Sequence, residues 1–153
     1  MTDSSTWGKI TWTFFHTLAE KVDEDKFLEV KKNLIDIIFG ICKNLPCPIC
    51  ANSATSILKQ AYLNNIKTKQ HFIEFLRQFH NIVNIKLSKP QFSRENLQNL
   101  YSKNNMNIVS DRFINIFKSK IFNINLITHS MHKDIYIKEL IKNLNSIKNN
   151  IRL

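Results

Sequence analysis

The sequence predicts an all-α fold, and three observations lead to this class. The chain of 153 residues contains only two glycines and three prolines, so few positions suit the tight turns of β-hairpins. Apolar residues recur at helical spacing in several long segments. With 43% apolar side chains, the chain is long enough for one domain with a proper core. We therefore expect a four-helix bundle with short connections, a short fifth helix and a helical C-terminal extension.

The first predicted helix covers residues 5 to 21, and Ser5 or Thr6 can serve as its N-cap. Its apolar face is formed by Trp7, Ile10, Phe14 and Leu18. The second helix should begin at Asp23, a good N-cap residue, and end before Pro46, which cannot continue a helix. Its apolar positions are Phe27, Val30, Leu34, Ile37, Ile38 and Ile41.

The third helix should start at the cysteines near residue 47, with a buried face formed by Ala54, Ile57, Leu58, Ala61 and Tyr62. The fourth covers residues 68 to 87 and ends before Pro90. Its inward face is formed by Phe72, Phe75, Leu76, Phe79, Val83 and Leu87. Ser93 should cap a short fifth helix that carries Leu97, Leu100 and Tyr101. Residues 111 to 122 and 133 to 148 have the pattern of two further helices.

The positive charge is uneven along the chain. Of the formal net charge of +10, residues 1–101 carry +4 and residues 102–153 carry +6. We therefore divide the chain into a domain over 1–101 and a basic, helical extension over 102–153. The extension could contact nucleic acid, although a solvated lysine face is the simpler interpretation. No apolar run is long enough to span a bilayer, and the N-terminus lacks the apolar core of a secretion signal, so we expect a soluble chain that its own signal does not export.

The segment LPCPICAN, residues 45–52, contains two of the three cysteines, Cys47 and Cys50. Pro48 suits the first position of a helix, which places Cys47 at the N-cap and Cys50 in the first turn. Free amides and the positive end of the helix dipole favour thiolates there, which is typical of a redox-active pair. Zinc is the alternative, but it needs two more ligands. Cys42, His71 or His80 could supply them, although none belongs to a second paired motif.

A dithiol that is oxidised repeatedly needs an electron acceptor. A Rossmann-type nucleotide site is excluded, because Gly8 and Gly40 are the only glycines. Trp12 and His16 lie four residues apart on the first helix, and His80, Asn84 and Leu87 share one face of the fourth, beside Asn81, Val83 and Lys86. A flat, hydrogen-bonding cofactor could satisfy these groups, and Lys86 and Lys89 could meet a pyrophosphate. Each residue alone also has an ordinary structural explanation.

Three motifs resemble those of the Erv/ALR family of FAD-linked sulfhydryl oxidases, in the family's order. They are W-G-x-x-x-W-x-x-x-H-T at residues 7–17, P-C-x-x-C-A at 46–51 and H-N-x-V-N-x-x-L-x-K-P-x-F at 80–92. The last motif is long and specific. The resemblance covers roughly residues 7–101, and the layout is most similar to members from large cytoplasmic DNA viruses.

The resemblance implies a helical bundle that binds FAD non-covalently, with Cys50 next to the flavin and Cys47 exchanging with a substrate dithiol. Electrons would pass from the substrate to FAD and then to oxygen, which yields hydrogen peroxide. The positions that match flavin contacts are Trp12, His16, His80, Asn81, Val83, Asn84, Lys86, Leu87 and Lys89. Trp7 and Gly8 match the start of the first helix, close to the cofactor. Tyr101 stands where many members have a tryptophan near the adenine.

Two departures from the family pattern matter. Many members carry a structural disulfide where this chain has Arg77 and Arg94, so we expect the fold to rely on its core. A second, shuttle cysteine pair is also missing, so electrons should arrive directly from a partner's dithiol. By resemblance we expect a thioredoxin-like or viral structural protein as substrate, a homodimer formed through the first two helices, and a location in the host cytoplasm at the viral assembly site or in the virion. The rival hypothesis is a zinc-stapled or basic module that binds nucleic acid.

Overall fold

Helices account for most of the described chain. The structure is a computed structural model that describes residues 6–122 and 127–153. Its α-helices are α1 (Trp7–Lys21), α2 (Phe27–Lys43), α3 (Pro48–Lys59), α4 (Lys69–Lys86), α5 (Arg94–Tyr101), α6 (Met106–Phe122) and α7 (Ile127–Ile147). Over these two ranges there is no β-strand, only an isolated antiparallel bridge between Val22 and Ile151. The predicted all-α class is confirmed.

Local capping signals set the starts of α4 and α5. Thr68 caps α4, because its hydroxyl oxygen accepts a hydrogen bond from the backbone N–H of His71 at 3.1 Å. Ser93 and Asn96 form a reciprocal capping box at the start of α5. Both starts lie where the sequence predicted them. The two C-terminal helices, by contrast, begin at residues 106 and 127, earlier than predicted.

The starts of α1 and α2 differ from the prediction. The side chain of Thr6 makes no capping hydrogen bond, and the alternative cap, Ser5, lies outside the described residues. Asp23 does not cap α2, because the short 3₁₀ turn Glu24–Lys26 separates the two. Its carboxylate instead accepts a hydrogen bond from Nε of Arg152 at 2.8 Å. The predicted capping role of Asp23 is therefore wrong, since this side chain ties the C-terminal residues to the turn after α1.

The third helix is shorter than the apolar pattern predicted. It ends at Lys59, where i→i+3 hydrogen bonds from the amides of Gln60 and Ala61 tighten the last turn. Tyr62 lies beyond this turn and is 82% exposed, so its predicted place on the buried face is wrong. The apolar pattern thus continues to Tyr62, beyond the end of α3, and only the backbone hydrogen bonds show where the helix ends.

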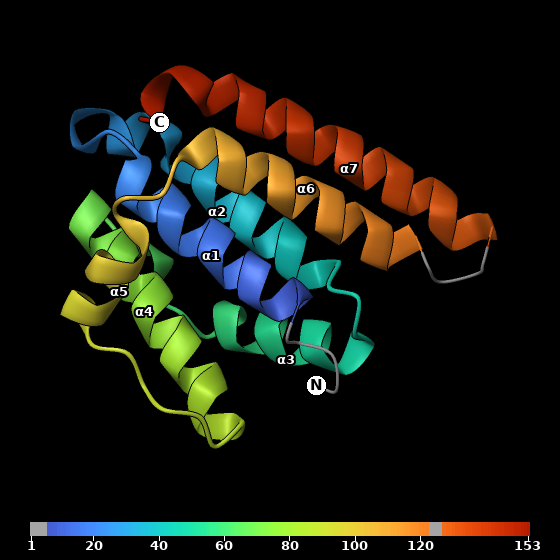
Figure 1. Cartoon of the computed structure of the whole chain (residues 1–153), viewed down its shortest axis with the longest axis horizontal. Helices are drawn as coiled ribbons and strands as arrows, with labels where there is room; N and C mark the ends of the chain where they lie inside the picture. Colours follow the sequence, from blue (N-terminus) through green and yellow to red (C-terminus); the bar gives the residue numbers. More distant parts are fainter. Residues whose placement is uncertain (1–5, 123–126) are drawn as a thin grey trace.

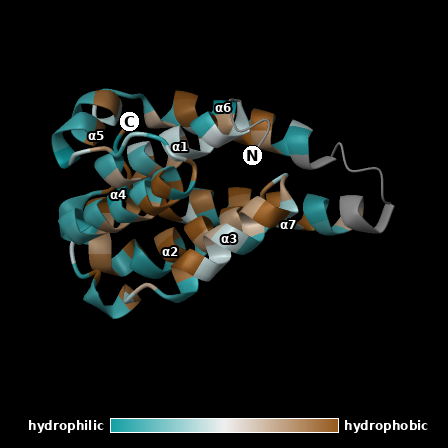
Figure 2. Ribbon diagram, turned by 90° about the horizontal axis from the view of Figure 1, so that it is seen from below, coloured by the Kyte–Doolittle hydropathy of each residue, from teal (hydrophilic) through white to brown (hydrophobic). Residues whose placement is uncertain are grey.

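The helices form two groups on either side of α1 and α2. In Figure 1, α6 and α7 run along one side of α1 and α2, while α3, α4 and α5 lie on the other. α1 packs most extensively against α6 and also contacts α4 and α5, and α2 packs against α3 and α7. Figure 2 shows hydrophobic residues gathered along the inner sides of the helices. None of the described helices is both long enough and apolar enough to cross a membrane.

The hydrophobic core includes residues from both sides of position 101. The ring of Phe14 in α1 stacks on Phe113 in α6 at 4.5 Å, and both side chains are fully buried. We define α6 and α7 together as the C-terminal hairpin. After the end of α7, the backbone N–H of Arg152 donates to the carbonyl of Lys21 at 2.7 Å. The hairpin thus shares one core with the preceding helices. Whether residues 1–101 fold alone stays a prediction.

Candidate active site

Cys47 and Cys50 are joined by a disulfide at the N-terminus of α3. Cys47 occupies the N-cap and Pro48 the first helical position, as the sequence predicted. The backbone N–H of Cys50 donates to Sγ of Cys47 at 3.3 Å. An amide of the first helical turn therefore faces the sulfur of Cys47, and it would stabilise a thiolate there whenever the disulfide is reduced.

The two cysteines differ in their access to solvent. Cys47 is half-buried, whereas Cys50 is only 8% exposed. Ile49, between them, is 81% exposed and places an apolar side chain next to the disulfide. An incoming thiol can therefore reach Cys47 more easily than Cys50, while Cys50 faces the interior.

The geometry does not support the zinc alternative. The two sulfur atoms are bonded to each other rather than open to a metal ion. Across 6–122 and 127–153, no group of three or more His, Cys, Asp and Glu side chains is placed to hold a metal. Of the ligands considered, His71 instead accepts a hydrogen bond from the backbone N–H of Lys67 at 3.2 Å.

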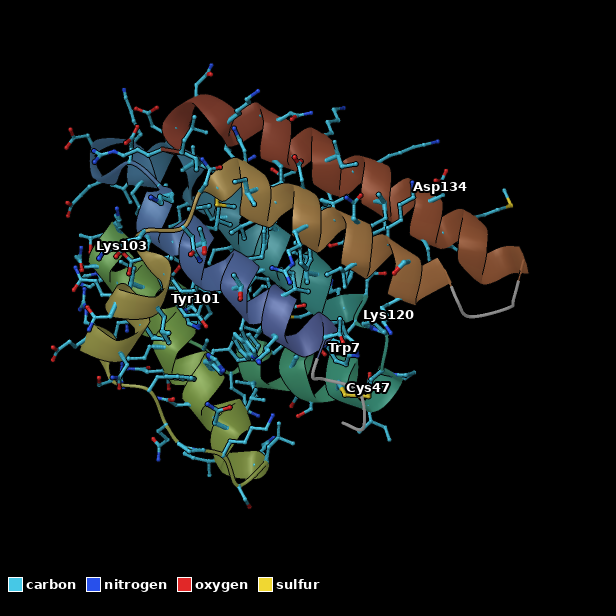
Figure 3. All side chains as sticks on the ribbon, viewed as in Figure 1. Trp7, Cys47, Tyr101, Lys103, Lys120 and Asp134 are labelled. Atoms are coloured by element: carbon cyan, nitrogen blue, oxygen red, sulfur yellow. A yellow bond between two sulfur atoms is a disulfide. The ribbon has the colours of Figure 1, made fainter. Side chains whose placement is uncertain are left out.

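A cavity of about 1200 Å³ opens beside the disulfide. This volume exceeds the roughly 300–1,000 Å³ of most small-ligand pockets and suits a ligand as large as a dinucleotide. Both cysteines of the disulfide line it, together with residues of α1, α3, α4, α5, the end of α2 and the segments before α3 and after α4. In Figure 3, Trp7 and Cys47 lie close together, and Tyr101 lies apart from them. No described residue of the C-terminal hairpin reaches the cavity wall.

One wall of this cavity is a stack of aromatic rings centred on His80. The indole of Trp12 lies parallel to the imidazole of His80, with ring centroids 3.9 Å apart and an interplanar angle of 6°. Behind this pair, Nε2 of His16 is 2.9 Å from Nδ1 of His80, and Tyr101 stacks on His16 at 5.0 Å. The nearly parallel rings from α1, α4 and α5 therefore form one contiguous stack, which we call the flat wall.

Both histidines of this wall are neutral at physiological pH. Burial lowers the pKa of His16 to about 3, and the neighbouring His80 lowers it as well. Burial also lowers the pKa of His80 to about 4, with a smaller contribution from the positive charge of Lys89. In a neutral pair, one imidazole donates its N–H and the other accepts, so the two rings hold each other in place.

Two asparagines on α4 fix the segment that follows this helix. Nδ2 of Asn84 donates to the carbonyl of Pro90 at 3.0 Å, and Nδ2 of Asn81 donates to the carbonyl of Phe92 at 2.9 Å. The backbone N–H of Phe92 in turn donates to Oδ1 of Asn81 at 2.8 Å. These buried amides thus find their partners in the backbone of the same cavity wall.

All the residues predicted to contact a cofactor line this cavity except His16 and Asn81. The lining members are Trp7, Gly8, Trp12, His80, Val83, Asn84, Lys86, Leu87, Lys89 and Tyr101. His16 and Asn81 do not line the cavity. His16 shares a hydrogen bond with His80, and Asn81 binds the backbone of Phe92. Contact between any of these residues and a cofactor stays a prediction.

Sequence reasoning missed several members of the cavity wall. Phe79 lines the cavity although the helical pattern assigned it to the core, and Lys9, Thr11 and Phe15 line it from α1 although the pattern did not single them out. Phe92 stood inside the third motif, which was the available signal for it. Residues between the known motif positions are hard to assign because a helix face can serve the core and a cavity together.

Cys42 also reaches this cavity, from the end of α2. It is only 1% exposed, and burial raises the pKa of its thiol to about 12. Cys42 is therefore a protonated thiol in an apolar setting, as expected of an inert core cysteine.

Comparisons with known proteins agree with this geometry. The model of the Erv1 / Alr family matches residues 9–103. The chain is 30% identical over 96 residues to FAD-linked sulfhydryl oxidase ERV1 of Arabidopsis thaliana, which covers 63% of this chain and 50% of that protein. It is 27% identical over 103 residues to FAD-linked sulfhydryl oxidase of African swine fever virus, covering 67% of this chain and 86% of the viral protein. The match thus spans half of the plant relative's length. No solved structure is significantly similar to the chain.

Proposed function

Because the chain belongs to the Erv1/Alr family, we propose that it is an FAD-dependent sulfhydryl oxidase that forms disulfide bonds in partner proteins. The observation that carries this proposal is the position of the Cys47–Cys50 disulfide, which lies at a helix N-terminus and on the wall of a dinucleotide-sized cavity. The match to relatives named FAD-linked sulfhydryl oxidases supports it. The same evidence leads us to set aside the nucleic-acid-binding alternative.

The residues of the cavity fit FAD. The flat wall of Trp12, His80 and Tyr101 suits planar rings, and the cavity also offers the exposed ammonium groups of Lys86 and Lys89 to a diphosphate. Bound FAD would supply a two-electron acceptor that passes electrons on to oxygen, with hydrogen peroxide as the product. The apolar side chains around the cavity, such as Phe15 and Phe79, would exclude water from the ring system.

The two cysteines divide the thiol chemistry. A substrate thiolate attacks Sγ of the accessible Cys47 and forms a mixed disulfide, and Cys50 leaves as a thiolate in the first turn of α3, near the positive end of the helix dipole. The second thiolate of the substrate then attacks the substrate sulfur that is bonded to Cys47. This step forms the substrate disulfide and releases Cys47 as a thiolate. The substrate has lost two electrons and two protons, and Cys47 and Cys50 have gained them.

The substrate and assembly state extend this proposal. We propose a protein dithiol as substrate, thioredoxin-like or a viral structural protein, because Cys47 is accessible and Ile49 offers an apolar contact beside it. We also propose a homodimer. Because α6 packs on α1 and α7 packs on α2, a dimer interface formed through the first two helices would have to use the sides of α1 and α2 that α6 and α7 leave uncovered. We also propose a site of action in the host cytoplasm or the virion, which only the resemblance to viral members of the family implies.

The test is the spectrum and the oxygen uptake of the purified full chain. We expect a yellow protein with flavin absorbance and about one FAD per chain, which consumes oxygen when dithiothreitol is added. A colourless protein that neither takes up added FAD nor consumes oxygen would contradict the proposal. Zinc in a one-to-one ratio would then favour the rival hypothesis.

A further inference from the structure

The connection between α4 and α5 forms part of the cavity wall. This rim loop, defined as residues 87–93, contributes Leu87, Lys89, Pro90 and Phe92 to the lining. The ring of Phe92 contacts the imidazole of His80, with centroids 4.9 Å apart. Since His80 stacks on Trp12, the position of Phe92 affects the whole flat wall.

Arg77 binds the rim loop from one helical turn before Asn81. Its Nη1 donates to the carbonyl of Phe92 at 3.1 Å, the same oxygen that accepts a hydrogen bond from Asn81. Both lone pairs of this carbonyl are thus used by side chains of α4. Arg77 lies outside the three sequence motifs and does not line the cavity.

Glu74 holds the guanidinium of Arg77 in this orientation. Its two carboxylate oxygens accept hydrogen bonds from Nη2 at 2.6 Å and from Nε at 2.9 Å, a bidentate geometry that fixes the plane of the group. The hydrogen bonds from Arg77 lower the pKa of Glu74, so the carboxylate is ionised at neutral pH. Nη1 is then left to point at the carbonyl of Phe92.

We propose that Arg77, oriented by Glu74, is a positioning residue for the flavin site, acting through the backbone of Phe92. The inference rests on the proposed function, because it concerns the affinity of this cavity for FAD. Without the guanidinium, only the two hydrogen bonds with Asn81 would hold the backbone of Phe92, and the rim loop would lose one of three side-chain hydrogen bonds at that residue. The flat wall would then spend part of its time in arrangements that do not fit planar rings.

The experiment compares Arg77→Met with Arg112→Met. Methionine keeps most of the apolar stem of arginine, and Arg112 is an exposed arginine on α6, so both variants lose one positive charge. FAD is titrated into the apoproteins and flavin fluorescence is followed. We expect Arg77→Met to bind FAD about tenfold more weakly, the effect of one charged hydrogen bond, and Arg112→Met to bind like the wild type. Arg77→Lys, which can still donate to the carbonyl, should recover part of the loss.

Two further measurements separate positioning from general stability. The apoprotein of Arg77→Met should melt within about 3 °C of the Arg112→Met apoprotein. The backbone N–H of Phe92 should exchange with deuterium faster in Arg77→Met than in the wild type. If Arg77→Met does not fold, Glu74→Gln is the alternative variant. It weakens the contact that orients the guanidinium of Arg77 and should weaken FAD binding about threefold.

The outcomes are distinct. Unchanged FAD affinity in the variant that folds would overturn the inference, and so would a fall in apoprotein stability large enough to explain the weaker binding. A wild-type protein that takes up no FAD would instead overturn the proposed function, whatever the variants do.

Discussion

The two sides of α1 are built from different kinds of contact. On the side of the cavity, His16 and His80 share a buried hydrogen bond and stack with Trp12. On the side of the C-terminal hairpin, Phe14 stacks on Phe113, which in turn stacks on Phe117, and all three are fully buried. One helix therefore carries polar residues that line or support the cavity wall on one face and fully buried aromatic rings of the apolar core on another.

This difference indicates how function and stability are divided in the molecule. Every described residue on the cavity wall belongs to positions 7–101, and the family match covers 9–103, whereas the hairpin lies outside both. The hairpin nevertheless completes the core. We therefore expect substitutions near the cavity to affect activity more than folding, and substitutions under the hairpin to do the reverse.

The largest effect should come from the cysteine pair. Cys47→Ser or Cys50→Ser removes one of the two sulfurs that exchange electrons, so dithiothreitol-driven oxygen uptake should fall at least about a thousandfold. FAD content, measured by absorbance, should stay unchanged because neither side chain supplies most of the cavity wall. Cys42→Ser is the control and should keep most of its activity. An inactive Cys42→Ser with full FAD would mean that a third cysteine takes part.

On the hairpin side, Phe113→Ala should lower the free energy of unfolding by about 3–5 kcal/mol, because it removes a fully buried ring and leaves a cavity. Urea denaturation measures this loss. The fraction that remains folded should bind FAD and oxidise dithiothreitol like the wild type. A folded variant with full FAD but little activity would show that the hairpin shapes the active site, and the division drawn above would fail.

The histidine pair should make stability depend on pH. The pKa values of His16 and His80 in the native state are about 3 and about 4, below the ordinary histidine value near 6.5. Between pH 6.5 and these lower values, the unfolded chain therefore binds protons that the native state does not. The contribution of the two histidines to the free energy of unfolding is thus full above pH 6.5 and is lost as the pH falls. Between pH 6.5 and pH 5 the loss should reach about 2 kcal/mol for each histidine.

Urea denaturation of the apoprotein at pH 7, 6 and 5 checks this dependence. A His16→Gln variant has one buried histidine fewer, so its stability should fall by about half as much over the same range. An equal dependence in the variant would mean that other groups cause the loss.

Local signals were enough to predict most helices and the place of the cysteines. The helical spacing of apolar residues, Pro46, Pro48 and the cap residue Ser93 act within a few positions of the helices that they define. The sequence could not show which helices the C-terminal segments would cover, because an amphipathic pattern identifies a buried face but not its partner. The docking of α6 on α1 therefore became visible only in the structure.

The candidate site shows the same limit. Motif spacing placed His16 and His80 on particular faces of their own helices. Whether the two side chains meet depends on how α1 packs against α4, and only the structure shows their hydrogen bond. Arg77 marked only the absence of a family disulfide, and its contact with Phe92 crosses fifteen residues. The fold thus has a polar link beside its core, which the sequence analysis did not predict.

The smallest effect concerns a strained residue on the side of the cavity. Ser88, which follows the C-terminus of α4, has a φ of 55°, the left-handed conformation that favours glycine after a helix. The backbone N–H of Lys89 nevertheless donates to the carbonyl of Asn84 at 2.8 Å, so the loop requires this conformation. Ser88→Gly should remove the strain and, after the entropy lost by a more flexible unfolded chain, stabilise the protein by about 1 kcal/mol. Thermal unfolding should show a melting temperature higher by about 2–4 °C.

Ser102→Gly is the matched control, because Ser102 has a φ of −63° and should gain nothing. FAD affinity should not change, since the rim loop keeps its hydrogen bonds. A Ser88→Gly protein that is no more stable but binds FAD more weakly would show that the serine side chain itself serves the site.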